Sequence, residues 1–401
     1  MNRKSSRQLQ LPSRLAADPR LAGRRSVLRM GAYGTGAVLL GGGILAACGS
    51  DASDTATTTT AGGTDTSEAD AGTTTTTGAA EVVSLGAASV AMNWINNVEY
   101  GGSWLALENG FYEEEGLEVS YLQGGPNAPQ STVAVAAGDA EIGVSSSLRA
   151  YMDAVLEGND FVIFATQYQT SPGGVLSLAS KPVRTPADLV GIKFLGQEGV
   201  DITIDAVLDI AGLEKEYEFI PAGFTPDPLI EGAGDAYSCF VVNQPITLEQ
   251  QFGLVEGEDF VVTTWADLGL PAYANMYFCQ RSFAEENHDL LVAFLRGTIK
   301  GWELNETDPT VAAELAVNVY GADLGLDIGQ QNRQNELQIP LMKGPLTEEK
   351  GLLWVDPEAL NGDMFGALAA AGREGLPDAN TLVDLTILED AYAGATSILN
   401  G

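Results

Sequence analysis

The sequence has few of the side chains on which most enzymes rely. Its 401 residues include one histidine and three cysteines. It has no Gly-x-Ser-x-Gly turn, no Walker-type phosphate loop, no His-Glu-x-x-His and no Cys-x-x-Cys. These absences argue against a serine hydrolase, a nucleotide hydrolase, a zinc protease and a dithiol oxidoreductase. We therefore expect no catalytic residue, no metal site and no cofactor.

Basic residues are also scarce. Lysine and arginine number 20 against 54 acidic residues, which gives a net charge of −34. The basic residues are concentrated near the N-terminus, so the remainder is strongly acidic. A protein region with this strong negative charge repels the phosphate backbone of nucleic acids, which excludes nucleic acid as a partner.

The first 48 residues have the features of an export signal. Scattered basic residues precede the pair Arg24 and Arg25, and a glycine-rich apolar run follows over 31–47. That run is too short and too glycine-rich for a membrane span. The arginine pair resembles a Tat signal, although Gly23 and Val27 depart from its pattern, which leaves Sec export open.

The apolar run ends at Leu45-Ala46-Ala47-Cys48, which resembles a bacterial lipobox. The resemblance implies that Cys48 carries a lipid anchor and that the protein is exported to the outer face of the cytoplasmic membrane. Residues 49–80 are rich in Thr, Asp, Gly and Ala and contain no aromatic or large aliphatic side chain. We predict a disordered tether there.

From residue 81 the pattern alternates between strands and helices. Strands are predicted at 81–88, 117–123, 140–146 and 161–169, and then at 174–181, 192–196, 217–223, 236–245, 260–269 and 273–280. Helices are predicted between them, at 102–109, 129–137, 148–156, 201–211, 226–231 and 248–253, and over nearly all of the tail from 283. This order predicts an α/β protein with two mostly parallel sheets flanked by helices.

The alternation of strands and helices begins a second time with the strand predicted at 174–181. This repetition predicts two lobes joined by a hinge. Lobe one is expected at 81–172, lobe two at 173–272, and the return to lobe one at 273–401. Ligands of open α/β sheets bind at the carboxyl ends of strands, so the loops there are the candidate cleft.

Several segments resemble one family. Trp94, Asn97 and Gly102, followed by "ENGFYEEEGLEV" at 108–119, resemble periplasmic binding proteins related to yeast thiamine-pyrimidine synthase. "GGPNAPQSTVAVAAGDAEIGVSSS" at 124–147, "TPADLVGIKF" at 185–194 and "DPLIEGAGDAYSCFVVNQP" at 227–245 continue the match. The resemblance implies a type II periplasmic-binding-protein fold.

The departures from that family concern its enzymatic branch. Tyr100 stands where the synthases have a histidine, and the synthases' cysteine-rich iron-binding segment is missing. Both changes argue against an enzyme. Gln244 replaces the glutamate of the family's Asn-Glu-Pro motif, which weakens the case for a ligand with an amino-pyrimidine edge.

Aromatic side chains near the predicted cleft are candidates for ligand stacking. Trp94 follows a strand, and we expect it to contact ligand, whereas helical spacing predicts core packing for Trp104. Tyr100 fits either role, and for Trp265 core packing competes with ligand contact.

Neutral polar residues near strand ends complete the candidate site. Amides offer both a donor and an acceptor to a heterocycle, although each could equally cap a loop. The candidates are Asn97, Gln167, Asn243 and Gln244. Gln197 is a further candidate, in the stretch 196–199 whose glycines allow close backbone approach to a ligand or simply make a turn. Ser145 and Ser146 could bind an anion or carbonyl, or cap a helix. An exported protein could also form a disulfide between Cys239 and Cys279, but their sequence positions leave pairing open.

Together these features predict a lipid-anchored solute-binding protein of an ABC importer. Its expected partners are a small-molecule ligand, an ABC permease with its ATPase, and the membrane through the anchor, and we expect a monomer. The resemblance places a thiamine pyrimidine precursor first among ligands, riboflavin-like compounds second, and nitrate, sulfonate or taurine third. A pyrimidine synthase is the competing enzyme class.

Overall fold

The structure is a computed structural model that describes residues 82–125, 128–197 and 199–400. These residues belong to one compact unit. The predicted signal segment, the tether and Cys48 lie outside the described residues.

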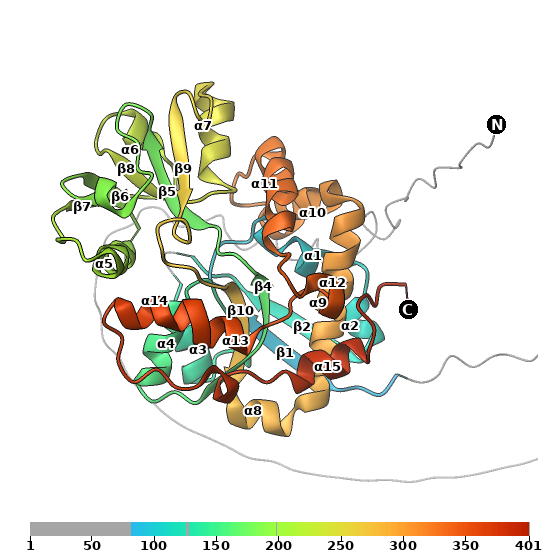
Figure 1. The fold of residues 1–401 in the computed structure, drawn as a ribbon. Coiled ribbons are helices and arrows are strands. Elements are labelled where there is room, and N and C mark those ends of the chain that lie inside the picture. The colour runs from blue at the N-terminus through green and yellow to red at the C-terminus, as the bar shows by residue number, and fades with distance from the viewer. Residues whose placement is uncertain (1–81, 126–127, 198, 401) are drawn as a thin grey trace, which may run out of the picture. The chain divides into compact units, whose positions relative to one another are not determined.

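Two five-stranded sheets form the framework (Figure 1). The first has the order β2-β1-β3-β10-β4 and consists of β1 (Gly86–Ala91), β2 (Leu117–Leu122), β3 (Ile142–Ser145), β4 (Phe161–Tyr168) and β10 (Ala274–Gln280). The second has the order β7-β6-β8-β5-β9 and consists of β5 (Gly173–Leu178), β6 (Lys193–Gly196), β7 (Glu218–Pro221), β8 (Ala236–Phe240) and β9 (Phe260–Thr264). We call each sheet with its helices a lobe.

The two sheets have equivalent strand orders, and each contains one reversed strand. β10 is antiparallel to β3 and β4, and β5 is antiparallel to β8 and β9, while the other pairings are parallel. The reversed strands are those that follow the two crossings between lobes. The prediction of two mostly parallel sheets is therefore confirmed. The range predicted for lobe two, 173–272, stays a prediction, and all strands of the second sheet fall inside it.

Helices flank both sheets, and most of the C-terminal tail is helical. Those before β10 are η2 (Val98–Tyr100), α1 (Gly101–Glu108), α2 (Phe111–Glu114), α3 (Ser131–Ala137), α4 (Leu148–Leu156), η3 (Pro186–Leu189), α5 (Val200–Ala211), α6 (Asp227–Ile230) and α7 (Gln244–Phe252). Those after it are α8 (Arg281–Glu286), α9 (His288–Thr307), α10 (Pro309–Leu315), η4 (Ala316–Tyr320), α11 (Ile328–Leu341), α12 (Thr347–Lys350), α13 (Pro357–Ala359), η5 (Leu360–Met364), α14 (Phe365–Ala370), η6 (Ala379–Thr381) and α15 (Thr386–Tyr392). No helix in the described ranges is both long and apolar enough to cross a membrane.

Three predicted strands have clearly different limits in the structure. One is β9, which ends at Thr264 rather than at residue 269, because residues 265–269 form a turn. β1 extends to Ala91 rather than ending at residue 88, because Val90 and Ala91 pair with both β2 and β3. β8 ends at Phe240 rather than at residue 245, because Pro245 occupies the first turn of α7. Proline has no N–H for a strand ladder but fits the first turn of a helix.

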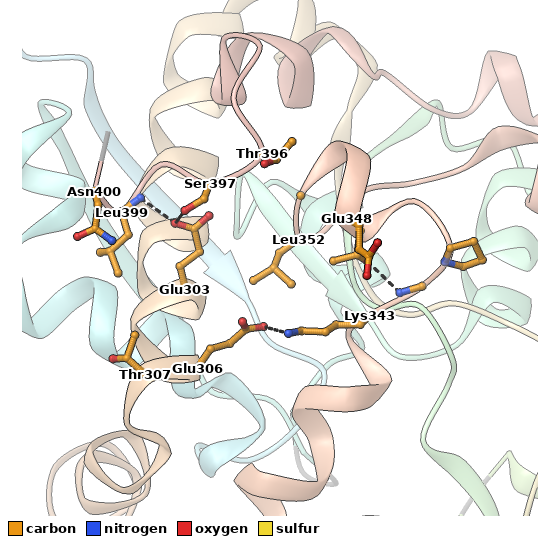
Figure 2. Close-up of a pocket in the computed structure, with 14 residues that line it drawn as sticks. Glu303, Glu306, Thr307, Lys343, Glu348, Leu352, Thr396, Ser397, Leu399 and Asn400 are labelled. Atoms are coloured by element: carbon orange, nitrogen blue, oxygen red, sulfur yellow. Dashed lines mark hydrogen bonds and ion pairs between the residues drawn. The ribbon is translucent and has the colours of Figure 1, made fainter.

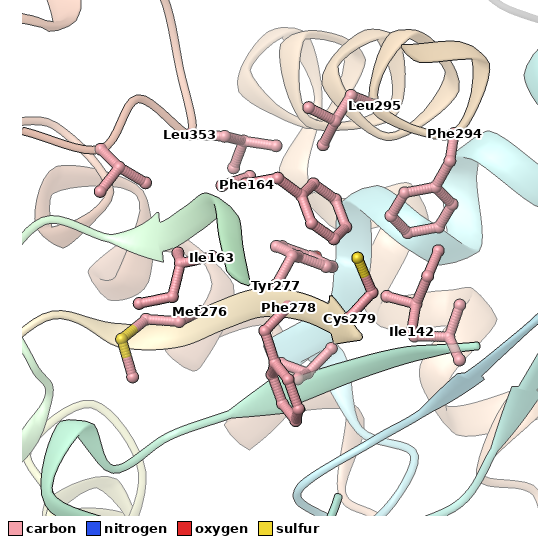
Figure 3. Close-up of a cluster of buried hydrophobic side chains, with 14 of the residues drawn as sticks. Ile142, Ile163, Phe164, Met276, Tyr277, Phe278, Cys279, Phe294, Leu295 and Leu353 are labelled. Carbon is pink, nitrogen blue, oxygen red and sulfur yellow. The ribbon is translucent and has the colours of Figure 1, made fainter. Parts of the chain in front are cut away.

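The core of the first lobe lies on both faces of its sheet, with α9 packed on one face and α3 and α4 contributing side chains as well. All eight residues of β4 are buried, which is typical of a strand covered on both faces. Figure 3 shows Phe164, Tyr277 and Phe294 gathered between the strands and α9, and the Tyr277 and Phe294 ring centroids are 5.8 Å apart. Cys279 is fully buried in the same cluster.

Glycines allow α1 to pack very closely on α9. A Cβ at Gly301 of α9 would lie 2.0 Å from the backbone oxygen of Gly102 in α1. A Cβ at Gly102 would lie 2.4 Å from the Trp302 ring. Since η2 directly precedes α1, this contact fixes the segment that carries Asn97 to Tyr100.

We predict that Gly301→Ala destabilises the fold by roughly 1–3 kcal/mol, because the added methyl group meets backbone that cannot move away alone. Urea unfolding measures the change. Gly366→Ala in α14 is the matched control, since a Cβ there has nothing within 4 Å. Removing the flexibility of that helical glycine should be neutral or stabilising. Equal effects of the two substitutions would contradict the close-packing argument.

Candidate functional site

A cavity of about 170 Å³ lies at the carboxyl ends of strands from both sheets. Loops that follow β1, β3, β6, β8 and β9 contribute to its wall. This is the location that the strand-end rule predicts for ligands of open α/β sheets.

Seven predicted site residues line this cavity. They are Trp94, Asn97, Ser146, Gln197, Asn243, Gln244 and Trp265. The first three come from the first lobe and the other four from the second. Three further candidates, Tyr100, Ser145 and Gln167, do not line the cavity.

Tyr100 does not line the cavity but packs behind residues that do. Its ring is fully buried, and its hydroxyl accepts the Trp94 backbone N–H at 2.9 Å. The same hydroxyl donates to Asn93 Oδ1 at 2.9 Å. Tyr100 therefore holds the loop from which Trp94 projects, and direct stacking on a ligand stays a prediction.

Ser145 and Gln167 also act behind the wall. The Ser145 hydroxyl donates to the Ser147 carbonyl at 3.1 Å. The Gln167 side chain donates to the Glu99 carbonyl at 2.8 Å. These hydrogen bonds stabilise the segments that carry Ser147 and Glu99. Neither the Ser145 hydroxyl nor the Gln167 amide lines the cavity.

Two tryptophans supply the flat surfaces of the cavity. Trp94 is half-buried and meets Phe224 of the second lobe edge to face, with ring centroids 5.0 Å apart. Trp265 stacks on Phe194 at 6.3 Å, and Gly173 leaves room for its ring, since a Cβ there would come within 2.9 Å of it.

Trp104 belongs to the core, as predicted. It is fully buried and stacks on Tyr320 with ring centroids 4.3 Å apart. Its indole N–H donates to the Asn97 carbonyl at 2.8 Å.

The amides of the wall are held by protein partners. Gln197 accepts from the Ser238 hydroxyl at 2.7 Å and donates to the Gly223 carbonyl at 2.8 Å. Gln244 Oε1 accepts the Phe240 N–H at 2.8 Å. Asn243 donates to Gln334 of α11 at 2.6 Å, which links the second lobe to a helix beside η2. Such fixed amides present a neutral, oriented polar surface.

Glu99 is a wall residue that the sequence pattern did not predict. It is 1% exposed, and its Oε1 accepts from Asn275 at 2.9 Å and from Asn93 at 3.5 Å. Burial raises the pKa of this carboxyl to about 7, and the amide hydrogen bonds only partly offset the effect. Glu99 lies between the Trp94–Asn97 motif and Gly102, and this position within the family motif could have marked it as a candidate site residue.

Other missed wall residues include Asn93, Ser238 and Phe240. Lysine and arginine are absent from the described residues that line the cavity. Within residues 82–125, 128–197 and 199–400, no three His, Cys, Asp or Glu side chains gather closely enough to hold a metal ion.

The disulfide that the sequence left open does not form. Cys239 lies in β8 of the second sheet and Cys279 in β10 of the first, and both are free. Each thiol is buried within its own lobe, and Cys239 also lines the cavity.

A larger hollow, of about 850 Å³, lies near the end of α9, the loop after α11 and the C-terminal segment (Figure 2). Two of its glutamates are already paired: Lys343 lies 3.0 Å from Glu306, and Glu303 accepts the Leu399 N–H at 2.7 Å. No aromatic side chain is among the described residues that line it. We therefore assign the candidate site to the smaller cavity between the lobes.

Comparison with known proteins gives several relatives at about the same similarity. A formylaminopyrimidine-binding protein of Halalkalibacterium halodurans is 25% identical over 78% of this chain and 91% of its own length. A 4-amino-5-hydroxymethyl-2-methylpyrimidine phosphate synthase of Legionella pneumophila is 25% identical over 57% of this chain and 72% of its own length. The riboflavin-binding protein RibY of Chloroflexus aurantiacus is 25% identical over 68% of this chain and 78% of its own length.

Among solved structures, the periplasmic aliphatic sulphonate binding protein SsuA of Escherichia coli superposes with a TM-score of 0.55. It is 16% identical, and the match covers 74% of this chain and 92% of that protein. At this identity the likeness shows the fold, which is that of periplasmic binding proteins. The family described as NMT1/THI5 like matches residues 97–312, more than half of the sequence. The chain therefore belongs to the NMT1/THI5-like family.

Proposed function

We propose that this protein is the solute-binding component of an ABC importer and that it captures a small heteroaromatic solute. A precursor of the thiamine pyrimidine is the first candidate. The observation that carries the proposal is the pair Trp94 and Trp265, contributed by different lobes to a cavity with amide walls. Flat rings suit a heterocycle, and amides can satisfy its polar edge.

The size of the cavity favours a single ring. Sites for drug-sized ligands typically measure about 300–1,000 Å³, whereas this cavity holds about 170 Å³. A pyrimidine fits such a space better than the three fused rings and side chain of a flavin. Riboflavin-like ligands are therefore the second candidate, supported by the relative RibY.

Nitrate, sulfonate and taurine are the third group of candidates. Binding of a strong anion usually employs lysine or arginine, and no such side chain is present among the described wall residues. The SsuA likeness at 16% identity supports the fold and not the ligand.

The enzyme alternative is a pyrimidine synthase, and one relative bears that name. The residues available here speak against it. Tyr100 is committed to holding the Trp94 loop. The single histidine, His288, begins α9 and bonds to Asp390 at 2.8 Å, and it does not line the cavity.

Closure of the two lobes around the solute would present the loaded protein to a permease and its ATPase. We further propose a monomer that is lipid-anchored through Cys48 at the outer face of the cytoplasmic membrane. The lipobox-like sequence before Cys48 supports the anchor.

A thermal-shift screen of the purified protein tests the ligand class. The panel contains hydroxymethylpyrimidine, formylaminopyrimidine, thiamine, riboflavin, taurine and nitrate. A ligand at 100 times its dissociation constant stabilises the folded state by about 2.7 kcal/mol, which is readily detected. We expect a shift with an aminopyrimidine, and a shift only with an anion would contradict the proposal.

Trp94→Ala should weaken binding of the same ligand by about 2 kcal/mol, or roughly thirtyfold, because it removes one stacking surface. Calorimetric titration measures the dissociation constant. Phe252→Ala, an exposed aromatic at the end of α7, is the control and should leave affinity unchanged. Equal affinities of the wild type and Trp94→Ala would remove Trp94 from the ligand site.

Cys48→Ser should release the protein from the membrane fraction, because the thioether that carries the lipid can no longer form. Fractionation followed by mass spectrometry of the N-terminal peptide measures the outcome. Cys279→Ser, which changes a buried thiol in the first lobe, is the control and should remain membrane-bound. An unlipidated Cys48 in membrane-bound protein would refute the anchor.

A further inference from the structure

Glu99 presents a carboxyl group to a cavity whose other described wall residues are uncharged at neutral pH. It lies on η2, in the first lobe, and lines the cavity together with the neutral amides Asn97, Gln197 and Gln244. Two side-chain amides, those of Asn275 and Asn93, donate to its Oε1. Among the described residues, it forms no ion pair with any lysine, arginine or histidine.

The titratable groups that surround Glu99 cannot compensate its charge. They are Tyr100 of η2, Tyr168 of β4 and Tyr277 of β10, and burial raises the pKa of each phenol, so all three stay neutral. An ionised carboxylate without a cationic partner is costly to bury. A ligand that supplied the missing positive charge or strong donors would therefore gain binding energy at this point.

The backbone around Glu99 is built to hold it in place. Asn275 adopts a left-handed conformation, with φ of 51°, which directs its amide to both Glu99 and Gln167. Asparagine adopts this conformation more readily than other non-glycine residues, so the turn is accommodated here with little strain. Gln167 in turn donates to the Glu99 carbonyl at 2.8 Å, so the main chain and side chain of Glu99 are fixed together.

We propose that Glu99 selects the ligand by accepting a hydrogen bond from a protonated ring nitrogen, as in a protonated 4-aminopyrimidine. This inference rests on the proposed function and names the recognised edge of the ligand. Because Oε1 already accepts from Asn275 and Asn93, Oε2 is the oxygen that would meet the ligand. A hydrogen bond that involves ionised groups is about twice as strong as a neutral one, and the amino group makes the ring nitrogen basic enough to carry the proton.

The same geometry disfavours the other ligand classes. The imide edge of a flavin cannot take up the carboxyl proton, and an ionised carboxylate repels the carbonyl oxygens on both sides of its N–H, so only the neutral form of Glu99 could pair with it. A sulfonate or nitrate would bring a second negative charge next to Glu99. The carboxylate that the sequence analysis found missing at Gln244 is thus supplied from the opposite lobe.

Proton balance at the site is simple. The pKa of Glu99 near 7 means that part of the free protein carries a neutral carboxyl at neutral pH. When a neutral aminopyrimidine binds, the carboxyl proton moves to the ring nitrogen and no further proton is needed. The product is a hydrogen-bonded ion pair at a carboxylate that is only 1% exposed.

The test is calorimetric titration of the wild type and Glu99→Gln with 4-amino-5-hydroxymethyl-2-methylpyrimidine and with its analogue that has an oxo group in place of the amino group. We expect the wild type to prefer the amino compound by at least tenfold. Glu99→Gln should lose at least tenfold in affinity for it, because a hydrogen bond to a charged group is replaced by a neutral one, and should lose the preference. Glu118→Gln, at an exposed position on β2, removes the same charge and should change neither value.

The outcomes separate this inference from the proposed function. If the wild type binds the amino compound and Glu99→Gln binds it equally well, the role of Glu99 is overturned while solute binding stands. If the wild type prefers the oxo compound, the proposed edge is wrong. If it binds no heterocycle at all, the proposed function fails, and the inference fails with it.

Unfolding of the free protein gives an independent readout. The pKa of Glu99 is raised from 4.5 to about 7 on folding, so the folded state holds more protons between these values. Wild-type stability should therefore fall as pH rises from about 4.5 to 7 and level off above. Glu99→Gln has no carboxyl at this position, so its stability should not show this fall. In urea unfolding, the free energy of unfolding of Glu99→Gln minus that of the wild type should therefore be more positive at pH 8 than at pH 5. An unchanged difference at the two pH values would contradict the burial of an uncompensated carboxyl.

Discussion

The site depends on the close contact between α1 and α9. Gly102 and Gly301 let the two helices approach until backbone meets backbone, and Trp302 covers the crossing. Because η2 continues directly into α1, the position of this contact determines where Glu99 and Asn97 lie. A larger residue at either glycine would displace the turn, and with it the floor of the cavity. The glycine in the family motif is thus explained by packing, since a Cβ at Gly102 would collide with Trp302.

The second constraint is a buried row of amides on α11. Gln331 accepts the Val98 N–H at 2.7 Å, and Gln338 donates to the Val98 carbonyl at 2.8 Å. The main chain of η2 is therefore hydrogen-bonded from both sides without any charged group. Gln334 on the same helix accepts from Asn243, so the row also reaches the wall of the second lobe. Buried polar groups of this kind are tolerated when they find partners, and they then fix one arrangement rather than several.

The strand-end rule explains why much of the cavity could be predicted from the sequence. Trp94 and Gln197 follow recognisable strands, so their loops are expected to meet, whereas the pattern extends the strand before Trp265 to residue 269. The pattern does not reveal the direction of a side chain within a short turn. For that reason the sequence does not distinguish between ligand contact and core packing for Tyr100, and it does not single out Glu99. The row of amides on α11 was also hidden, because polar residues at helical spacing normally indicate a solvated face. The sequence likewise does not show whether Cys239 and Cys279 can form a disulfide. In the structure they lie in different sheets, and both thiols are free.

Local charge, rather than the net charge of −34, should decide which solutes this protein accepts. At physiological ionic strength, charges on the surface are screened beyond about 8 Å. A buried carboxylate in contact with a ligand is screened far less, and two unit charges 4 Å apart interact by about 4 kcal/mol at an effective dielectric constant of 20. The cost of desolvating both charges offsets part of that attraction. The attraction acts only on a ligand that brings a positive charge, whereas stacking, worth about 0.5–1.5 kcal/mol beyond buried area, acts on any flat ring. The tryptophans would therefore favour any flat ring of suitable size, and Glu99 would distinguish among such rings by the donors on their edges.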